Sequence, residues 1–231
     1  MVSDECMKLS PDKQDEIKKA LGAKAATLID NGMIVGLGSG TTATYFIESL
    51  IERCRKGLKI KAVSSSIKSQ ELAKRGGIEV LDMDNIATID LTIDGADEID
   101  PQNRMIKGGG GAHVREKIVA SSSKKMVVIV DESKLVNKLG AFGLPVEILP
   151  FGLASTIHKL QQLGYTGKIR ENFITDNGNL ILDIHTPKFF DNPEKDHTNI
   201  INVPGVVDTG FFLNIPVKVL VGYANNTVEF R

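Results

Sequence analysis

The sequence predicts an α/β protein in which a Rossmann-like parallel sheet domain is joined to a smaller ferredoxin-like α+β domain. Two observations lead to this fold class. As far as about residue 140, short apolar strands alternate with helical segments, which is typical of a parallel sheet covered by helices on both faces. Beyond that point the predicted order becomes βαββαβ, which fits a small antiparallel sheet with two helices.

The composition is that of an ordinary globular protein. The chain has 231 residues, of which 42% are hydrophobic and 25% charged, and its net charge is -1. This charge argues against broad electrostatic binding to nucleic acid or to a membrane. The N-terminus lacks a signal-peptide pattern, and no apolar stretch approaches the roughly 20 residues of a membrane span. We therefore expect a cytoplasmic protein, with Cys6 and Cys54 as reduced bystanders because their spacing matches no metal site.

The first predicted helix begins at Ser10-Pro11, because a hydroxyl N-cap precedes a proline, and ends at Asn31-Gly32, where glycine accepts the left-handed conformation. A later helix is capped by Ser64-Ser65-Ser66 and stops at Gly76-Gly77. Further elements follow from apolar periodicity. Strands are expected at 33–37, 59–63, 78–81, 89–93 and 126–130, and helices at about 43–55 and 112–123.

The second part of the chain has a different pattern. A strand at 144–148 carries a proline near its start, which suits an edge position. Asn177-Gly178 predicts a hairpin between two strands, and Asn192-Pro193 predicts a helix start. Other elements are a helix at about 153–163, a strand over 206–212, and a buried strand at 217–221 that can return to the first sheet. We therefore expect a Rossmann-like catalytic domain over 1–142, completed by 214–231, and a small α+β domain over 143–213.

A glycine-rich turn at 36–42 joins the first strand to the following helix. Backbone amides there can approach a phosphate, and the helix dipole favours an anion. Ser39, Gly40, Thr41 and Thr42 are therefore candidate substrate-binding residues. The turn lacks the third glycine of a dinucleotide fingerprint and the Gly-Lys-Ser/Thr of a Walker loop. A tight turn with a threonine N-cap is the alternative interpretation.

Asp94 directly follows the apolar run of the fourth strand, and Asp97 comes three residues later. The strand alternation places Asp94 on the face opposite Ile93. Two nearby carboxylates can hold sugar hydroxyls, bind a divalent metal or perturb each other's proton affinity. The structural alternative is a turn former followed by a helix cap. His113 is the only histidine nearby, and its spacing matches no zinc signature.

Lys107 stands before a run of four glycines, Gly108 to Gly111. Such a run is unfavourable in conformational entropy unless the backbone must adopt conformations that other residues forbid. The backbone amides of Gly108, Gly109 and Gly110 can form a nest for an oxyanion, and Lys107 can stabilise a developing negative charge. A flexible loop with an exposed lysine is the alternative.

Glu116 follows the glycine run in the first turn or so of a predicted helix. A carboxylate there is suited to remove a proton beside a carbonyl group, although most helical glutamates are solvated. Lys134, after the fifth strand, is equally compatible with a phosphate ligand and a surface residue. Lys18 and Lys19 are expected to be solvated helix residues.

Taken together, these motifs resemble the ribose-5-phosphate isomerase type A family. The agreement runs from about residue 15 to about residue 222 and keeps the family's order. The motifs that carry it are Gly-Leu-Gly-Ser-Gly-Thr-Thr at 36–42, Asp-Gly-Ala-Asp-Glu at 94–98, Lys-Gly-Gly-Gly-Gly-Ala at 107–112, Arg-Glu-Lys at 115–117, Asp-Glu-Ser-Lys at 131–134, Leu-Pro-Val-Glu at 144–147, Thr-Asp-Asn-Gly-Asn at 175–179 and Pro-Gly-Val-Val at 204–207.

The resemblance implies an aldose–ketose isomerase of the non-oxidative pentose phosphate pathway, which interconverts D-ribose 5-phosphate and D-ribulose 5-phosphate through an enediolate without a metal or other cofactor. It implies Glu116 as the proton acceptor and Asp94, Asp97 and Lys107 around the reacting sugar. It also implies a substrate loop at 39–42, Lys134 as a substrate ligand, and a homodimer or sometimes a tetramer.

The sequence is also compatible with two other functions. A non-enzymatic sugar-phosphate sensor would use the same fold, although no DNA-binding helix-turn-helix segment is evident. A nicotinamide-dependent dehydrogenase is disfavoured by the missing third glycine at 36–42. Binding without turnover would indicate the sensor, and an absorbance change in the nicotinamide band would indicate the dehydrogenase.

Overall fold

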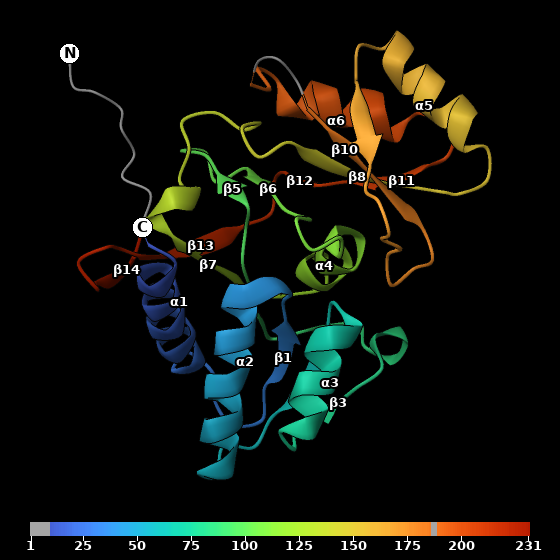
Figure 1. Ribbon diagram of the computed structural model, residues 1–231. Helices are drawn as coiled ribbons and strands as arrows, with labels where there is room; N and C mark the ends of the chain where they lie inside the picture. The colour runs from blue at the N-terminus through green and yellow to red at the C-terminus, as the bar shows by residue number, and fades with distance from the viewer. Residues whose placement is uncertain (1–9, 186–188) are drawn as a thin grey trace, which may run out of the picture.

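The computed structural model describes residues 10–185 and 189–231; Cys6 lies outside these ranges. Within them the protein is a mixed α/β structure, with a mostly parallel seven-stranded sheet and antiparallel sheets of four and three strands. Figure 1 shows the four-stranded sheet and its two helices beside the larger sheet. This arrangement confirms the predicted fold class.

The seven-stranded sheet has the order β14-β13-β7-β4-β1-β2-β3. Its neighbouring strands are parallel except for β14, which pairs antiparallel with β13. The strands are β1 (Ile34–Leu37), β2 (Lys61–Ser64), β3 (Glu79–Val80), β4 (Leu91–Asp94), β7 (Met126–Asp131), β13 (Val217–Gly222) and β14 (Val228–Phe230). The strand expected to return at 217–221 is β13, which lies beside β7 with Val217 opposite Met126.

Helices cover both faces of this sheet. On one face, α1, α2 and α3 lie side by side (Figure 1) and share a core with Leu37 and Ile93. On the other face lies α4, whose Val119 packs against Val63 and Ile89. Alternate strand residues thus enter opposite cores, as the pleat requires. The helices are α1 (Pro11–Ala26), α2 (Gly40–Arg55), α3 (Ile67–Arg75) and α4 (His113–Ser121), with short 3-10 helices η1 (Met83–Asn85) and η2 (Glu132–Lys134).

The helix starts agree with their sequence signals. Ser10 precedes Pro11 and accepts a hydrogen bond from the Lys13 amide, and Ser66 accepts one from the Ser69 amide. The predicted end of α1 at Asn31-Gly32 is wrong, because the helix ends at Ala26. Thr27 follows it, and its hydroxyl donates to the Lys24 carbonyl at 2.7 Å, which gives the last turn a local partner. Gly32, with φ of 83°, belongs to the later turn into β1.

The smaller sheet has the order β11-β8-β10-β9, and all its neighbouring strands are antiparallel. With one helix after the first strand and one after the third, this is the ferredoxin-like order. The helix α6 begins after the Asn192 cap, as predicted. The elements are β8 (Leu144–Ile148), α5 (Leu153–Gln162), β9 (Gly167–Ile169), β10 (Leu180–Ile184), α6 (Pro193–Ile201) and β11 (Val206–Thr209).

Pro145 was expected on an edge strand, and this prediction is wrong. It lies in β8, which has β10 on one side and β11 on the other. The Pro145 carbonyl accepts a hydrogen bond from the Gly210 amide, just beyond the last β11 residue, Thr209. A proline is tolerated there because its missing N–H lies where the pairing with β11 has already ended.

The hairpin prediction at Asn177-Gly178 is only partly right. β9 and β10 do pair antiparallel, but a loop over 170–179 joins them, and Asn177-Gly178 lies at the end of it. Of the two residues only Gly178 has a positive φ, whereas a two-residue type I′ turn needs both. The Gly178 amide instead closes a turn on the Thr175 carbonyl at 2.9 Å.

A three-stranded sheet with the order β12-β6-β5 was not predicted. Phe211 and Phe212 were expected to belong to one strand with 206–208, but they form a separate strand that pairs with β6. This small sheet lies between the two larger ones (Figure 1), and it carries the chain from β4 towards the glycine run. Its strands are β5 (Glu98–Ile99), β6 (Met105–Ile106) and β12 (Phe211–Phe212).

Candidate active site

The predicted site residues gather at one edge of the parallel sheet, around a pocket of about 150 Å³. The carboxyl ends of β1 and β4 meet there because neighbouring parallel strands end at the same edge. Of the predicted residues, only Asp94 is not part of the pocket wall. The residues lining it are Lys18, Ser39, Gly40, Thr41, Thr42, Gly95, Ala96, Asp97, Lys107, Gly108, Gly109, Gly110, Glu116 and Lys134.

Lys107 is buried at the base of the pocket, with its side chain 3% exposed. Its ammonium group lies 2.9 Å from Oδ2 of Asp94 and 3.2 Å from Oε2 of Glu116, and it donates to the Gly95 carbonyl at 2.5 Å. Burial alone lowers the pKa of Lys107, but the two carboxylates outweigh it and raise the pKa above the usual value. Lys107 is therefore a fixed positive charge and not the exposed lysine of a flexible loop.

Asp94 is the last residue of β4 and lies behind Lys107. Its Oδ1 accepts hydrogen bonds from the amides of Ser39 at 3.0 Å and Gly95 at 2.8 Å. Burial raises the pKa of Asp94 to about 7, although Lys107 opposes the shift. A Cβ atom at Gly38 would lie 2.1 Å from Oδ1 of Asp94. The glycine-rich turn thus has a packing role, since it lets β1 approach this carboxylate.

Asp97 lines the pocket and caps no helix, since β5 follows it directly. Its Oδ2 accepts a hydrogen bond from the Gly109 amide at 2.8 Å. Burial raises the pKa of Asp97, although the Gly109 amide and Lys107 oppose the shift. The Gly109 amide therefore has a partner inside the protein. Of the three amides predicted to form a nest, this one is directed at Asp97 and not at a ligand.

Glu116 lies in the first turn of α4, and only 4% of it is exposed. The Ser39 hydroxyl donates to Oε1 of Glu116, while Lys107 lies at Oε2. Ser39 is the N-cap residue of α2, yet its side chain makes no capping hydrogen bond, because its hydroxyl is directed at Glu116. Glu116 is thus a buried carboxylate with one polar partner at each oxygen. This arrangement is consistent with a general base and differs from the solvated glutamate that a helix usually carries.

The N-terminus of α2 faces the pocket. Gly40, Thr41 and Thr42 form its first turn and belong to the pocket wall. The first amides of a helix have no partner within the helix, and the helix dipole adds positive potential. Together with the nearby ammonium groups of Lys18 and Lys134, this end of the pocket can hold an anion such as a phosphate.

Lys18 was expected to be a solvated helix residue, and this expectation is wrong. It is half-buried and lines the pocket from α1. Its neighbour Lys19 does follow the expectation, because it is exposed and pairs with Asp15 at 3.0 Å. Nothing local in the sequence separates the two lysines. Only the packing of α1 against α2 turns one of them towards the pocket.

Within residues 10–185 and 189–231, no group of three or more histidine, cysteine, aspartate and glutamate side chains is arranged to hold a metal ion. In the same residues, no helix combines the length and apolar character needed to span a bilayer. His113 is buried behind the glycine run, with Nε2 3.3 Å from the Asp208 carbonyl oxygen.

Comparisons with known proteins agree with this geometry. The family model described as ribose 5-phosphate isomerase A (phosphoriboisomerase A) matches residues 61–226. The chain is 48% identical over 219 residues to ribose-5-phosphate isomerase A of Chlamydia felis, covering 92% of this chain and 94% of that protein. It is 49% identical over 217 residues to the protein of the same name from Protochlamydia amoebophila, with the same two coverages.

Solved structures give the same result. Ribose 5-phosphate isomerase A from Methanocaldococcus jannaschii superposes with a TM-score of 0.88 at 37% identity, covering 94% of this chain and 99% of that one. Ribose 5-phosphate isomerase from Plasmodium falciparum superposes with a TM-score of 0.90 at 39% identity, covering 94% and 98% of the two chains.

Proposed function

The chain belongs to the ribose 5-phosphate isomerase A family, and from this premise we propose how its pocket interconverts D-ribose 5-phosphate and D-ribulose 5-phosphate. The observation that carries the proposal is the buried group formed by Glu116, Lys107 and Ser39 beside a cationic end of the same pocket. The carboxylate is the base, the ammonium group stabilises the negative charge of an enediolate, and the cationic end holds the phosphate.

The phosphate binds at the N-terminus of α2. The amides of the first turn and the hydroxyls of Thr41 and Thr42 donate to it, and Lys18 and Lys134 supply positive charge. Binding at this end directs the sugar carbons towards Glu116 and Lys107. The proposed phosphate site therefore determines which carbon atoms reach the base.

Glu116 removes the proton from C2 of the open-chain aldose and returns it to C1. The Ser39 hydroxyl and Lys107 hold one carboxylate oxygen each, so the side chain has little rotational freedom. Lys107 also lies where the enediolate oxygen develops charge, a stabilisation often worth roughly 3 kcal/mol for a single donor. Proton transfer by a positioned base typically contributes about 100- to 10,000-fold.

Ring opening is assigned to Asp97 and not to Asp94. Asp97 lines the pocket, whereas Asp94 lies behind Lys107 and already accepts two amide hydrogen bonds. Burial raises the pKa of the Asp97 carboxyl group, which favours its exchange of a proton with the ring oxygen and the anomeric hydroxyl. Asp94 instead holds Lys107 in position.

The whole protein is organised as two domains. The catalytic domain spans 1–142 and 214–231, and the small domain spans 143–213. The two larger sheets have separate cores, which supports this division, and Ile106 and Leu139 of the catalytic domain also pack into the core of the small sheet. The protein is cytoplasmic and forms a homodimer or a tetramer. Phe151 of the small domain is 92% exposed, and burial in an interface between subunits would remove this apolar surface from water. Sedimentation of the purified protein tests the assembly.

Turnover of ribose 5-phosphate by purified, chelator-treated protein tests the activity. Formation of the ketose without added metal or nicotinamide is the expected result. A folded protein that binds the sugar phosphate without converting it would instead be a sensor and would overturn the proposal. An absorbance change in the nicotinamide band on adding cofactor and sugar would indicate a dehydrogenase.

A further inference from the structure

Arg170 lies just after β9 in the small sheet, outside the pocket wall, and its guanidinium group is fixed by a carboxylate. Nε donates to Oδ2 of Asp183 at 2.9 Å, and Nη2 donates to Oδ1 at 2.6 Å. Such a two-point contact determines the plane of the guanidinium group as well as its position. The ring of Phe173 also lies 5.2 Å from the guanidinium carbon.

The same guanidinium group reaches the glycine run. Nη1 donates to the Gly109 carbonyl at 3.0 Å, and both terminal nitrogens lie 3.4 Å from the Gly108 carbonyl oxygen. Phe173 packs against Gly111, where a Cβ atom would lie 2.2 Å from its ring. The glycine run, which has few side-chain contacts of its own, is therefore held from the side of the small sheet.

Gly109 connects this contact to the pocket. Its carbonyl accepts from Arg170, while its amide donates to Oδ2 of Asp97 at 2.8 Å. A Cβ atom at Gly109 would lie 2.7 Å from Oδ1 of Asp97, so the carboxylate packs directly on this backbone. A continuous chain of hydrogen bonds thus runs from Asp183 through Arg170 and Gly109 to Asp97.

We propose that Arg170 is a positioning residue, which acts through the Gly109 backbone to orient Asp97 for the opening of the sugar ring. This inference rests on the proposed function, in which Asp97 opens the ring and Glu116 transfers the proton. Arg170 itself touches no reacting atom. Its effect should therefore appear in the step that needs Asp97 and be absent from the step that needs only Glu116.

The chemistry of the two sugars separates these steps. Ribose 5-phosphate closes into a furanose, so its conversion requires ring opening. Ribulose 5-phosphate cannot close in this way, because its 5-oxygen carries the phosphate. Exchange of a C1 proton of ribulose 5-phosphate with deuterated solvent needs Glu116 and the enediolate but no ring opening. The ratio of ribose 5-phosphate turnover to C1 exchange therefore reports on Asp97.

The experiment compares Arg170→Met, Asp183→Asn and Asp97→Asn with the unaltered chain. Arg170→Met should lower kcat for ribose 5-phosphate about 10- to 100-fold, the loss expected when a reacting group is displaced by a fraction of an ångström to one ångström. Its C1 exchange should stay within about threefold of the unaltered chain. Asp183→Asn should also lower turnover more than C1 exchange, but by a smaller factor than Arg170→Met. Asp97→Asn should do so by a larger factor.

Combining Arg170→Met with Asp97→Asn tests whether the two residues act on the same route. Coupled residues give non-additive effects, so Arg170→Met should lower turnover less than about twofold in the Asp97→Asn background. Arg53→Met is the matched control. Arg53 also donates to backbone carbonyls, those of Ala26 and Ile29, but it lies at the far end of α2, so its loss should lower the thermal midpoint and leave the ratio unchanged.

Three outcomes would overturn the inference: an Arg170→Met chain that turns over ribose 5-phosphate normally, one that loses exchange in the same proportion as turnover, or one whose loss is fully additive with that of Asp97→Asn. An Arg170→Met chain that does not fold is replaced by Asp183→Asn, which keeps the guanidinium group. If the unaltered chain shows neither turnover nor exchange, the proposed function fails, and that result is distinct from all three.

Discussion

Lys107 and Asp94 form an ion pair of 2.9 Å in which the two side chains are only 3% and 2% exposed. Removal of Lys107 would leave Asp94 and Glu116 as buried carboxylates without their shared counter-ion, which is strongly destabilising. The pair also determines the place of the Lys107 ammonium group relative to Glu116. In the proposed mechanism Asp94 therefore holds Lys107 in place without reaching the substrate.

Asp94 should titrate at unusually high pH. Burial raises the pKa of Asp94 to about 7, the nearby Glu116 charge adds to the shift, and Lys107 opposes it. Carbon-13 NMR of the carboxyl groups should find a titration near pH 7 that disappears in Asp94→Asn. In Glu116→Gln the same titration should move to lower pH, because the neighbouring negative charge is gone. A titration of Asp94 near pH 4 in the unaltered chain would contradict this assignment.

The same shift has a consequence for stability. Because the pKa of Asp94 in the folded chain lies above its value in the unfolded chain, the folded chain binds more proton at Asp94 than the unfolded chain does between about pH 4 and pH 7. The contribution of Asp94 to the free energy of unfolding must therefore fall as the pH rises through this window and stay constant above it. The free energies of unfolding of the unaltered chain and of Asp94→Asn can be measured in urea at several pH values. The difference between the two should change across this window and level off above pH 7.

Glu116→Gln should lower kcat by about 100- to 10,000-fold, since the amide keeps the size of the side chain but cannot accept the proton. KM should change little, because the phosphate end of the pocket is untouched. The variant should also lose exchange of the C1 proton of ribulose 5-phosphate. Glu52→Gln, on the exposed side of α2, is the control and should be fully active. Near-normal turnover by Glu116→Gln would exclude this residue as the base.

Lys18→Met should raise KM for ribose 5-phosphate by about tenfold, as expected when one charged contact worth roughly 1.5 kcal/mol is lost, and should change kcat less. Inhibition by inorganic phosphate should weaken in parallel, because the same site binds it. Lys19→Met is a closely matched control, since Lys19 is the next residue but pairs outward with Asp15. Equal effects of the two substitutions would indicate general electrostatic attraction and no phosphate contact from Lys18.

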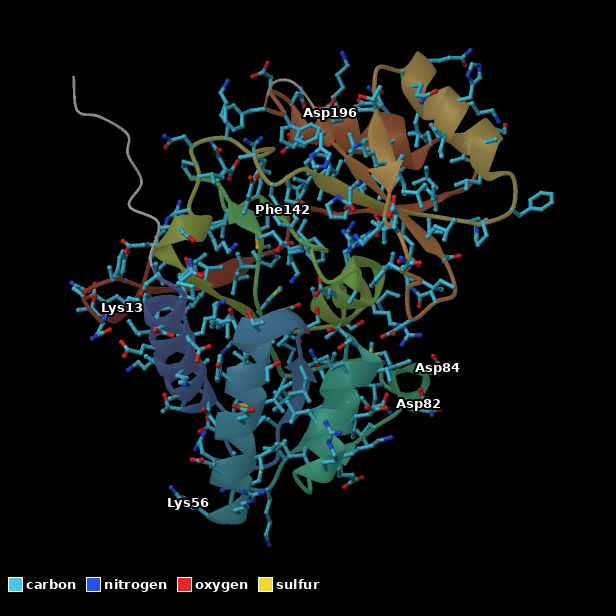
Figure 2. All side chains as sticks on the ribbon, viewed as in Figure 1. Lys13, Lys56, Asp82, Asp84, Phe142 and Asp196 are labelled. Carbon is cyan, nitrogen blue, oxygen red and sulfur yellow. The ribbon has the colours of Figure 1, made fainter. Side chains whose placement is uncertain are left out.

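Gly109→Ala should displace Asp97 while leaving the fold intact. The added methyl carbon would lie 2.7 Å from Oδ1 of Asp97 and 2.9 Å from the ring of Phe142. Phe142, labelled in Figure 2, lies between the two larger sheets and is 41% exposed, so it can move aside more readily than the carboxylate. We expect turnover to fall about 10- to 100-fold, with unfolding in urea nearly unchanged. Normal turnover would show that the Asp97 position tolerates this displacement.

Gly22→Ala should destabilise the protein by about 1–3 kcal/mol through overpacking. Gly22 is buried in α1, and a Cβ atom there would lie 2.5 Å from the backbone carbon of Tyr45 in α2. Helix propensity alone would favour alanine by about 1 kcal/mol. The neighbouring exposed position gives the contrast, since Ala23→Gly should cost only about that propensity difference. A stabilised Gly22→Ala chain would show that α1 and α2 can move apart at this contact with little loss of packing energy.

The sequence predicted most of the pocket because parallel strands end together. The motifs at 36–42 and 94–97 follow neighbouring strands of one sheet, so their convergence follows from topology. Glu116 was recognised by its closeness to the glycine run, although its burial was not predictable. Lys18 was missed because the helix that carries it reaches the pocket only by packing against α2, and a helical pattern does not specify its neighbour.

The errors in the fold have similar causes. The strands Glu98–Ile99 and Met105–Ile106 contain two residues each, which is too short for an alternating pattern to appear. Pro145 was assigned to an edge because the sequence does not show that the pairing with β11 ends just before it. Arg170 had no local signal, since its contacts with the glycine run join distant segments of the chain, as the separation of 61 residues from Gly109 shows.

The pairing of β7 with β13 has a consequence for the order in which the protein folds. The two strands are adjacent in the sheet, but the whole four-stranded sheet is synthesised between Asp131 and Val217. Until the ribosome releases the last strand, β7 is an uncovered edge with apolar residues such as Val128 and Val130. Contacts of such long range form slowly, and open edges attract other chains. A nascent chain stalled before Val217 should therefore aggregate or require a chaperone. The large sheet gains its last two strands only when synthesis is complete.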